Sequence, residues 1–358
     1  MKPKSRSMRS SIPVLCFATA AVAATAAMPG NMEPDPAPSR NRFGASFRLA
    51  FNVKVDFEHI GSFASPSASR LTPDGDPFNY DDGYVLLDDT GMALGVTRYW
   101  GYDSASQVPG DGTLVMHRSS SAAGATSAGL DDDPLPGFEL NYRRELGRSK
   151  KLVWGAEAAF GYMNVSIRDS RPLTVAASQL SYAYPLPPLE GGGFVSPPPA
   201  PYQHGRDLSP EGNPVIGATP AAPAGGMVPV AVTGSRIFDA DVFGFRLGPY
   251  LELPLGEKWS VAISGGLALA EVCSDFTFNE AVALTGVPPA TGAGSHSDLR
   301  VGYYAAGTVG YKINPKWGVF AGVQFQDVGK YRHEEQGRAA VLDLSRAVFV
   351  MVGANVTF

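Results

Sequence analysis

Residues 347–358 read AVFVMVGANVTF, and this stretch decides the fold. Side chains of a β-strand point alternately to its two faces, so the stretch is read with a period of two. One face is wholly apolar: Val348, Val350, Val352, Ala354, Val356 and Phe358. The other face is smaller and partly polar: Phe349, Met351, Gly353, Asn355 and Thr357. The pattern predicts an amphipathic strand.

The same alternation recurs upstream, which predicts eight strands in all. The other seven cover residues 43–57, 138–143, 152–162, 243–253, 259–269, 301–313 and 317–326. Short turns join some of them at 147–151, 255–258 and 314–316, while long segments fill 61–135, 168–239, 275–298 and 330–345. A soluble sandwich has no reason to alternate short and long connections, but a transmembrane barrel has short periplasmic turns and longer extracellular loops. We therefore expect an all-β, antiparallel transmembrane β-barrel.

The strand number depends on a hairpin that the first long loop is expected to form. Residues 95–102 and 113–117 flank the turn sequence Pro109-Gly110-Asp111-Gly112. If this hairpin entered the sheet the barrel would have ten strands; otherwise it has eight, which we favour.

Composition excludes several classes of protein. Of 358 residues, 44% are hydrophobic and only 18% charged, and the net charge of -5 argues against a nucleic-acid binder. Beyond the first thirty positions no apolar run reaches the ~18 residues that a membrane-spanning helix needs.

The first residues predict export. Four basic residues precede an apolar stretch and the A-x-A site at 24–26, as in a secretory signal peptide. This assigns residues 1–26 to the signal, 27–42 to a linker and 43–358 to the barrel. Cys16 falls in the signal, so the exported chain would keep only Cys273 and form no internal disulfide.

The two strand faces suit a membrane barrel. The bulky apolar face would meet lipid, and the other face interleaves opposite charges with small residues, as a narrow lumen requires. These predicted lumen charges are Arg48, Lys54, Glu139, Arg143, Glu157, Arg246, Glu252 and Lys312. Trp154, Trp259 and Trp317 each follow a short turn, which predicts an aromatic girdle at one interface. A soluble secreted barrel, lipocalin-like, is the alternative fold.

Together with the signal sequence, residues 347–358 resemble the small outer-membrane β-barrels of Gram-negative bacteria, the OmpA/OmpX-like class. The resemblance covers most of residues 43–358 and implies the outer membrane, with lipid and lipopolysaccharide as surroundings. It also implies that the barrel-assembly machinery reads Phe358 as its insertion signal. The sequence departs from the class in its longer first and second loops and in lacking a peptidoglycan-binding domain after the barrel.

The loops give weaker signals. Residues 168–239 hold 13 of the chain's 30 prolines, which predicts a mobile, partly polyproline external loop without a packed core. Acid pairs at 81–82, 88–89 and 131–133 could bind Ca²⁺ but lack the spacing of a calcium loop, so solvated acids are the better interpretation. The five histidines are scattered, and His333 with two glutamates is weak evidence for a protease. We expect no enzyme, cofactor or bound metal.

Three functions remain open on sequence alone. The first is a structural or surface-binding barrel that meets extracellular partners through its long loops. The second is a narrow, porin-like channel for ions or small solutes, and the third is an outer-membrane enzyme with His333 as its best candidate residue.

Overall fold

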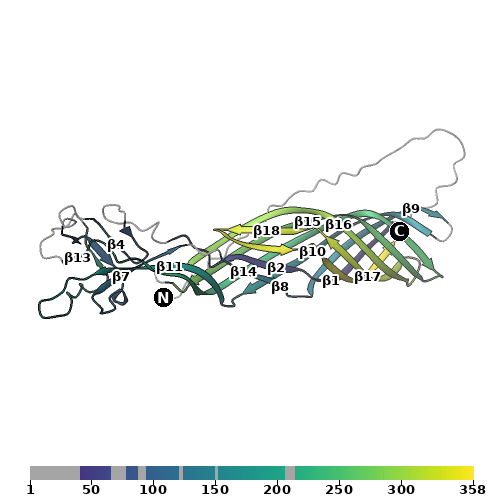
Figure 1. The fold of residues 1–358 in the computed structure, drawn as a ribbon. Coiled ribbons are helices and arrows are strands. Elements are labelled where there is room, and N and C mark those ends of the chain that lie inside the picture. The colour runs from purple at the N-terminus through teal and green to yellow at the C-terminus, as the bar shows by residue number, and fades with distance from the viewer. Residues whose placement is uncertain are drawn as a thin grey trace, which may run out of the picture. The chain divides into compact units, whose positions relative to one another are not determined.

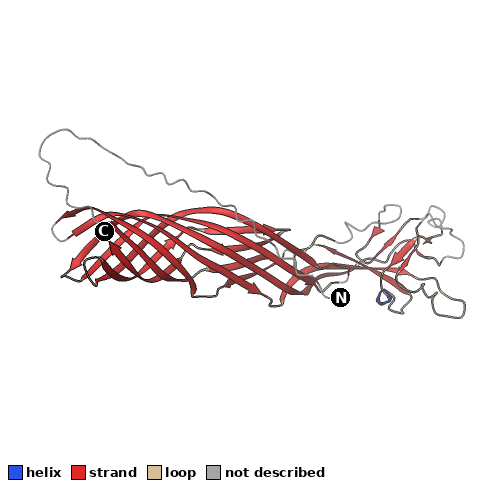
Figure 2. Ribbon diagram, turned by 180° about the vertical axis from the view of Figure 1, so that it is seen from behind, coloured by secondary structure: helices blue, strands red, loops and turns tan. Residues whose placement is uncertain are grey.

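The computed structural model describes residues 41–65, 78–87, 94–120, 124–149, 152–205, 214–284 and 286–358. The predicted signal peptide and residues 27–40 of the linker lie outside these ranges. Almost all regular structure is β-strand (Figure 2). The described residues also include one short 3-10 turn, η2 (Ala105–Gln107), and none of their helices has the length and hydropathy of a membrane span.

The eight predicted strands pair side by side in a ring (Figure 1). Each neighbouring pair is antiparallel and hydrogen-bonded, and the last strand pairs with the first. In ring order the strands are β1 (Asn41–Phe51), β9 (Leu135–Ser149), β10 (Leu152–Asp169), β14 (Ala224–Leu255), β15 (Trp259–Val282), β16 (Ala290–Lys312), β17 (Trp317–Asp327) and β20 (Ala347–Thr357). The prediction of an all-β antiparallel fold is confirmed.

One end of the ring carries the short turns, as expected. β9 leads into β10, β14 into β15 and β16 into β17 there, and Phe358 exchanges both backbone hydrogen bonds with Asn41. The other end, which we call the long-connection end, differs from the prediction. Most of the segments 275–298 and 330–345 is strand: residues 275–282 and 290–298 extend β15 and β16, and the second segment forms the hairpin of β18 (Lys330–Glu335) and β19 (Arg338–Asp343).

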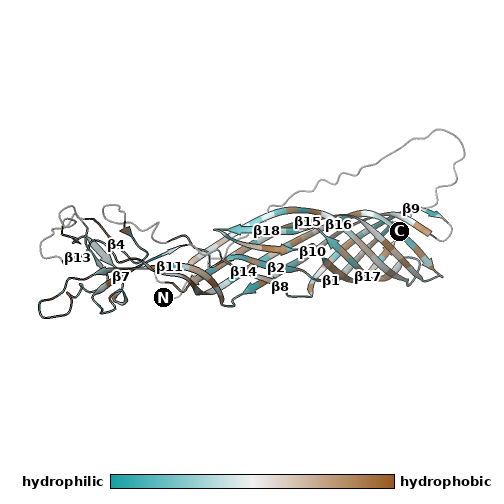
Figure 3. Cartoon of the chain, in the orientation of Figure 1, coloured by the Kyte–Doolittle hydropathy of each residue, from teal (hydrophilic) through white to brown (hydrophobic). Residues whose placement is uncertain are grey.

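Hydrophilic and hydrophobic residues follow one another along the ring strands (Figure 3), and the long strands change the polarity of their outward face between their two ends. On β15, Ile263 is exposed and Ala262 buried near the short-turn end. Further along the same strand, Thr277 is exposed while Phe276 and Phe278 are buried. The outward face is therefore apolar in the first part of the strand and polar in the second. Because of this change, the alternation in the sequence does not show where the strands end.

A second sheet packs against the extended parts of the ring strands. Its order is β18-β19-β2-β8, with β2 (Lys54–Ile60) and β8 (Ala125–Leu130). Phe57 of β2 stacks on Phe276 of β15 with 5.8 Å between ring centroids. The two layers enclose the main apolar core.

The first predicted strand, residues 43–57, is in fact two. Asn52 adopts a φ of 61°, in the left-handed region, and separates β1 from β2. As a result Phe47 is exposed on the ring, whereas Phe57 is buried in the second sheet.

A third part of the fold, here called the head, comprises the described residues within 78–120 and 182–218. β11 (Leu173–Pro185) joins it to the ring by pairing with β14 and with β7 (Thr113–Ser120). β7 thus belongs to the ring's sheet but lies outside the ring of eight. Two small sheets complete the head: β3 (Phe78–Asn79), β4 (Gly83–Val85), β6 (Trp100–Tyr102) and β12 (Tyr202–Gln203) in one, β5 (Val96–Thr97) and β13 (Ile216–Gly217) in the other.

Two loop predictions were wrong. Residues 95–102 and 113–117 do not pair as a hairpin, because β6 joins β4 and β12 while β7 joins β11. The proline-rich segment also contributes strands and a core. Tyr184, Leu186 and Ile216 pack with Trp100 and Met116 in a second apolar cluster. Prolines fit here because they lie at strand ends and edges, where a missing N–H costs no ladder bond.

Candidate functional site

The ring interior holds a connected set of buried charges. Arg246 donates from Nη2 to Glu139 at 2.6 Å and from Nη1 to Glu157 at 3.1 Å. Arg48 lies 3.4 Å from Glu139, and Arg143 donates to Glu157 at 2.5 Å. Each buried charge has an opposite partner, the condition under which ions are tolerated away from water. These five predicted lumen residues thus lie together.

Aromatic rings fill the space beside this network. The guanidinium of Arg48 lies 4.4 Å from the ring centroid of Phe349, and that of Arg246 lies 4.6 Å from Tyr304. Toward the long-connection end, the interior continues into the main apolar core. Side chains therefore occupy the interior, as is normal for rings of eight strands.

The other three predicted lumen charges lie outside this network. Glu252 pairs with Arg42 at 3.0 Å, nearer the short-turn end. Lys312 is exposed at the last position of β16. Lys54 is not in the ring at all: it is exposed on β2, because the turn at Asn52 takes the chain into the second sheet.

The tryptophans lie close to the short turns. Trp259 and Trp317 are the first residues of β15 and β17, and Trp154 is the third residue of β10. Their exposed fractions are 53%, 53% and 46%. Phe358, the predicted assembly signal, is 68% exposed at the same end.

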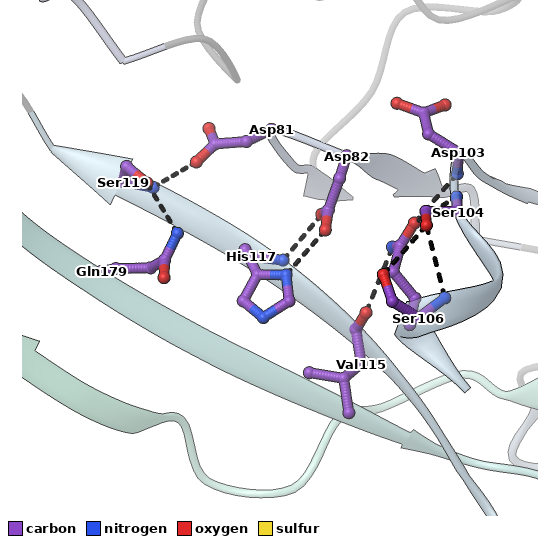
Figure 4. Close-up of polar contacts among 10 residues, drawn as sticks. Asp81, Asp82, Asp103, Ser104, Ser106, Val115, His117, Ser119 and Gln179 are labelled. Atoms are coloured by element: carbon purple, nitrogen blue, oxygen red, sulfur yellow. Dashed lines mark hydrogen bonds and ion pairs between the residues drawn. The ribbon is translucent and has the colours of Figure 1, made fainter. Parts of the chain in front are cut away.

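The head is held to its supporting strand by an unusual set of side-chain contacts (Figure 4). β7 pairs with β11 along one edge, so its other edge needs partners. Asp82 accepts the backbone N–H of His117 at 2.8 Å, and Asp81 accepts that of Ser119 at 2.5 Å. The N–H of Asp81 donates to the carbonyl of His117 at 2.8 Å. The turn between β3 and β4 therefore acts as a neighbouring strand, and we call these contacts the Asp81–Asp82 joint.

The 3-10 turn η2 adds one more contact to the same edge of β7. Gln107 donates from Nε2 to the carbonyl of Val115 at 3.1 Å, on the same edge of β7. Its Oε1 accepts the N–H groups of Asp103 and Ser104, which fixes the turn (Figure 4). Consecutive polar groups along the edge, from Val115 to Ser119, are thus satisfied by the head. Covering an edge in this way also prevents pairing with other chains.

His117 makes the joint sensitive to pH. Its Nδ1 lies 2.6 Å from Asp82, and because a carboxylate only accepts, Nδ1 carries the proton. This hydrogen bond is the main cause that raises the pKa of His117 above its usual value; its side chain is 22% exposed. Asp81 adds a smaller effect in the same direction.

We expect the head to be held more firmly in acid than in alkali. A histidine whose pKa is raised by folding contributes stability below its unfolded pKa, and loses it as pH rises through the folded pKa. Hydrogen-exchange protection of the Ser119 amide, corrected for intrinsic rates, should be several-fold higher at pH 5.5 than at pH 8.5. His117→Gln should flatten this dependence; an equal slope in the variant would contradict the role of His117.

Aromatic and cationic contacts complete the head. Tyr80 and Tyr184 join their hydroxyls at 2.6 Å, and Arg118 donates to the carbonyl of Asn79 at 2.7 Å. Trp100 packs on Tyr202 with 4.7 Å between centroids and donates to the carbonyl of Pro214 at 3.0 Å. Segments far apart in the sequence are therefore fixed to one another.

Of the remaining sequence candidates, His296 and His333 lie close together, with 5.8 Å between their ring centroids. Among the described residues, no three His, Cys, Asp or Glu side chains could together hold a metal ion. Asp133 accepts the N–H of Asn52, and residues 88–89 lie outside the described ranges. His333 is buried on β18, where its Nδ1 lies 2.8 Å from Ser274 Oγ.

Comparisons with known proteins give similar barrels at low identity. No family model and no curated protein matches the chain. Ail, the attachment invasion locus protein of Yersinia pestis, is 10% identical over 89% of this chain and 99% of its own, with a TM-score of 0.29. The outer membrane protease OmpT of Escherichia coli is 12% identical over 90% and 97%, with a TM-score of 0.30. The toluene transporter TodX of P. putida is 9% identical over 90% and 91%, with a TM-score of 0.18.

Proposed function

We propose that the chain is an outer-membrane β-barrel protein that displays the head outside the cell as a binding surface. The observation that carries this proposal is the exchange of polarity along the ring strands. Near the short turns the outward face is a band of exposed apolar side chains, and beyond the band the outward face is polar. A water-soluble ring would not expose such a band.

The band has the dimensions that a bilayer requires. On β15 it runs over residues 259–269, close to the ~9–11 residues with which a tilted strand crosses the hydrocarbon. A closed ring satisfies its own backbone groups, which is the condition for β-structure in lipid. Its exposed members include Phe43, Phe47, Phe138, Leu140, Trp154, Leu247, Leu251, Trp259, Ile263, Leu267, Val301, Tyr303, Trp317, Val319, Val323 and Val352.

The head supplies the part of the molecule that can meet a partner. It is built on the long connections, which face the outside of the cell in this class of barrel. Its own core orders it, so its surface is preformed, and a preformed surface binds with a smaller ordering cost. Leu189 and Phe194 remain exposed on either side of the glycines at 191–193, where a partner could bury them.

The interior does not favour the channel. The Arg246 network and the main apolar core follow one another along the ring, and opening a path would require separating buried ion pairs. Ser274 and His333 form a hydroxyl–imidazole pair, but both side chains are buried away from a substrate, so a surface-binding role is the better conclusion.

Removing the head should abolish binding and leave the ring folded. The pairs Ile60↔Ala125 and Leu173↔Val232 mark where short turns can replace residues 62–123 and 174–231. Cells displaying the full chain or the shortened variant are screened against arrays of glycans and matrix proteins. We expect ligands retained by the full chain to fall at least ~10-fold, to background, in the variant.

The control for this experiment determines on which side of the membrane the head lies. A peptide tag at Gly192, whose added side chain would meet nothing within 4 Å, should be labelled on intact cells. The same tag at Gly256, equally open but in a short turn, should be labelled only after the cells are permeabilised. Undiminished binding by the headless variant, or labelling of Gly256 on intact cells, would contradict the proposal.

A further inference from the structure

A cavity of about 280 Å³ opens at the short-turn end of the ring, and we call it the vestibule. Its walls come from the inward faces of β14, β15, β16 and β20, including Tyr250, Glu252, Ser260 and Asn355. Deeper in, a small space of about 20 Å³ lies beside Arg143. Arg143 is paired with Glu157, so the interior charge network forms the floor. The vestibule is therefore closed toward the head and open to solvent at the short turns.

Basic side chains surround the mouth of the vestibule. Two of the arginines are already paired: Arg42 with Glu252 at 3.0 Å and Arg148 with Glu145 at 3.1 Å. They contribute shape and donors but no net charge.

Three lysines remain uncompensated at the mouth. Lys258, Lys312 and Lys316 line the vestibule, and the described part of the chain places none of them in an ion pair. Glu257 is the remaining acidic residue of the lining, so the net charge there is two positive. The carbonyl of Lys258 accepts the N–H of Lys312 at 2.8 Å, so their backbones are adjacent. The three lysines thus lie along the rim of one small space, and Lys258 Nζ lies 6.0 Å from the ring centroid of Tyr311 there.

We propose that the vestibule binds a small soluble anion with two or more negative charges, carried by phosphate or carboxylate groups. Lysine ammonium groups bind phosphate as point charges with rotatable donors. A recess lined by one sign of charge and walled by protein concentrates counter-ions more than a flat surface does. At this volume it accepts a small ligand or the charged end of a larger one.

Titration calorimetry with inorganic pyrophosphate, and separately with citrate, tests this proposal on the refolded full chain in an uncharged detergent. The variant K258Q/K312Q removes two of the three lysines. Its charge-matched control is K54Q/K330Q, since Lys54 and Lys330 are exposed lysines on the second sheet. We expect K258Q/K312Q to lose at least ~10-fold in affinity, and the control to change less than ~2-fold.

Three outcomes would overturn the proposal: no binding of either anion at millimolar concentration, equal binding by K258Q/K312Q and the native chain, or an equal loss in the control. Heat-dependent gel mobility verifies that each variant is folded. A repeat in bilayers with and without phosphatidylglycerol identifies the source of the anion. Displacement of pyrophosphate by that lipid would assign the site to a headgroup and overturn the soluble ligand. The measured anion affinity depends on residues of the ring alone, so a negative result would leave the proposed role of the head untouched.

Discussion

Arg246→Met is expected to destabilise the ring by about 3 kcal/mol, because the buried carboxylates of Glu139 and Glu157 would each lose a charge-assisted hydrogen bond. Arg246 is 6% exposed and serves two carboxylates, Glu139 and Glu157. Each carboxylate keeps one other arginine, Arg48 or Arg143, which limits the loss. Equilibrium unfolding in urea, followed by tryptophan fluorescence in bilayers, measures the effect.

Arg332→Met is the matched control for this experiment. Arg332 also contacts two carboxylates, Glu58 and Glu334, but its side chain is 39% exposed on β18. Exposed ion pairs contribute ~0–1 kcal/mol, so the midpoint should hardly move. Equal shifts of the midpoint in the two variants would show that the buried network stabilises the protein no more than an exposed pair of salt bridges does. An unchanged midpoint in Arg246→Met would exclude the network as a support of the ring.

The sequence predicted the eight ring strands because their exposed apolar faces produce an uninterrupted alternation. The alternation that predicts β15 ends at Leu269, and the structure continues the strand to Val282. Beyond Leu269 the apolar residues move to the buried face, at Val272, Phe276 and Phe278. A pattern of fixed polarity could not follow that exchange. An alternation that reverses its faces within one segment is the signal that would have found it.

The head could not be read from local patterns. Apart from β7 and β11, its strands are two or three residues long, and core residues such as Leu186 and Ile216 lie beside prolines or glycines. The acids at 81–82 were interpreted as solvated. Their role depends on β7, some 35 residues further along the chain, and no spacing rule connects the two. By contrast, the position of the three tryptophans just after short turns is a local pattern that the sequence shows directly. In the structure all three side chains are exposed.

The apolar band gives a prediction that separates a membrane ring from a soluble one. Ile263 is 60% exposed on the outward face of β15, within the band, and Thr277 is exposed on the same face of the same strand beyond it. An arginine near the bilayer midplane of a transmembrane barrel costs ~2–4 kcal/mol, whereas one outside the hydrocarbon costs little. Both substitutions introduce an arginine on the outward face of β15, so the two variants are compared for their position along the strand.

The measurement is the unfolding free energy of Ile263→Arg and Thr277→Arg in bilayers, relative to the native chain. The membrane account predicts a loss of ~2–4 kcal/mol for Ile263→Arg and less than ~1 kcal/mol for Thr277→Arg. Equal small losses at both positions, with the chain folded in water without lipid, would contradict it. The ring would then be a soluble barrel, and its exposed apolar band would belong to a protein interface.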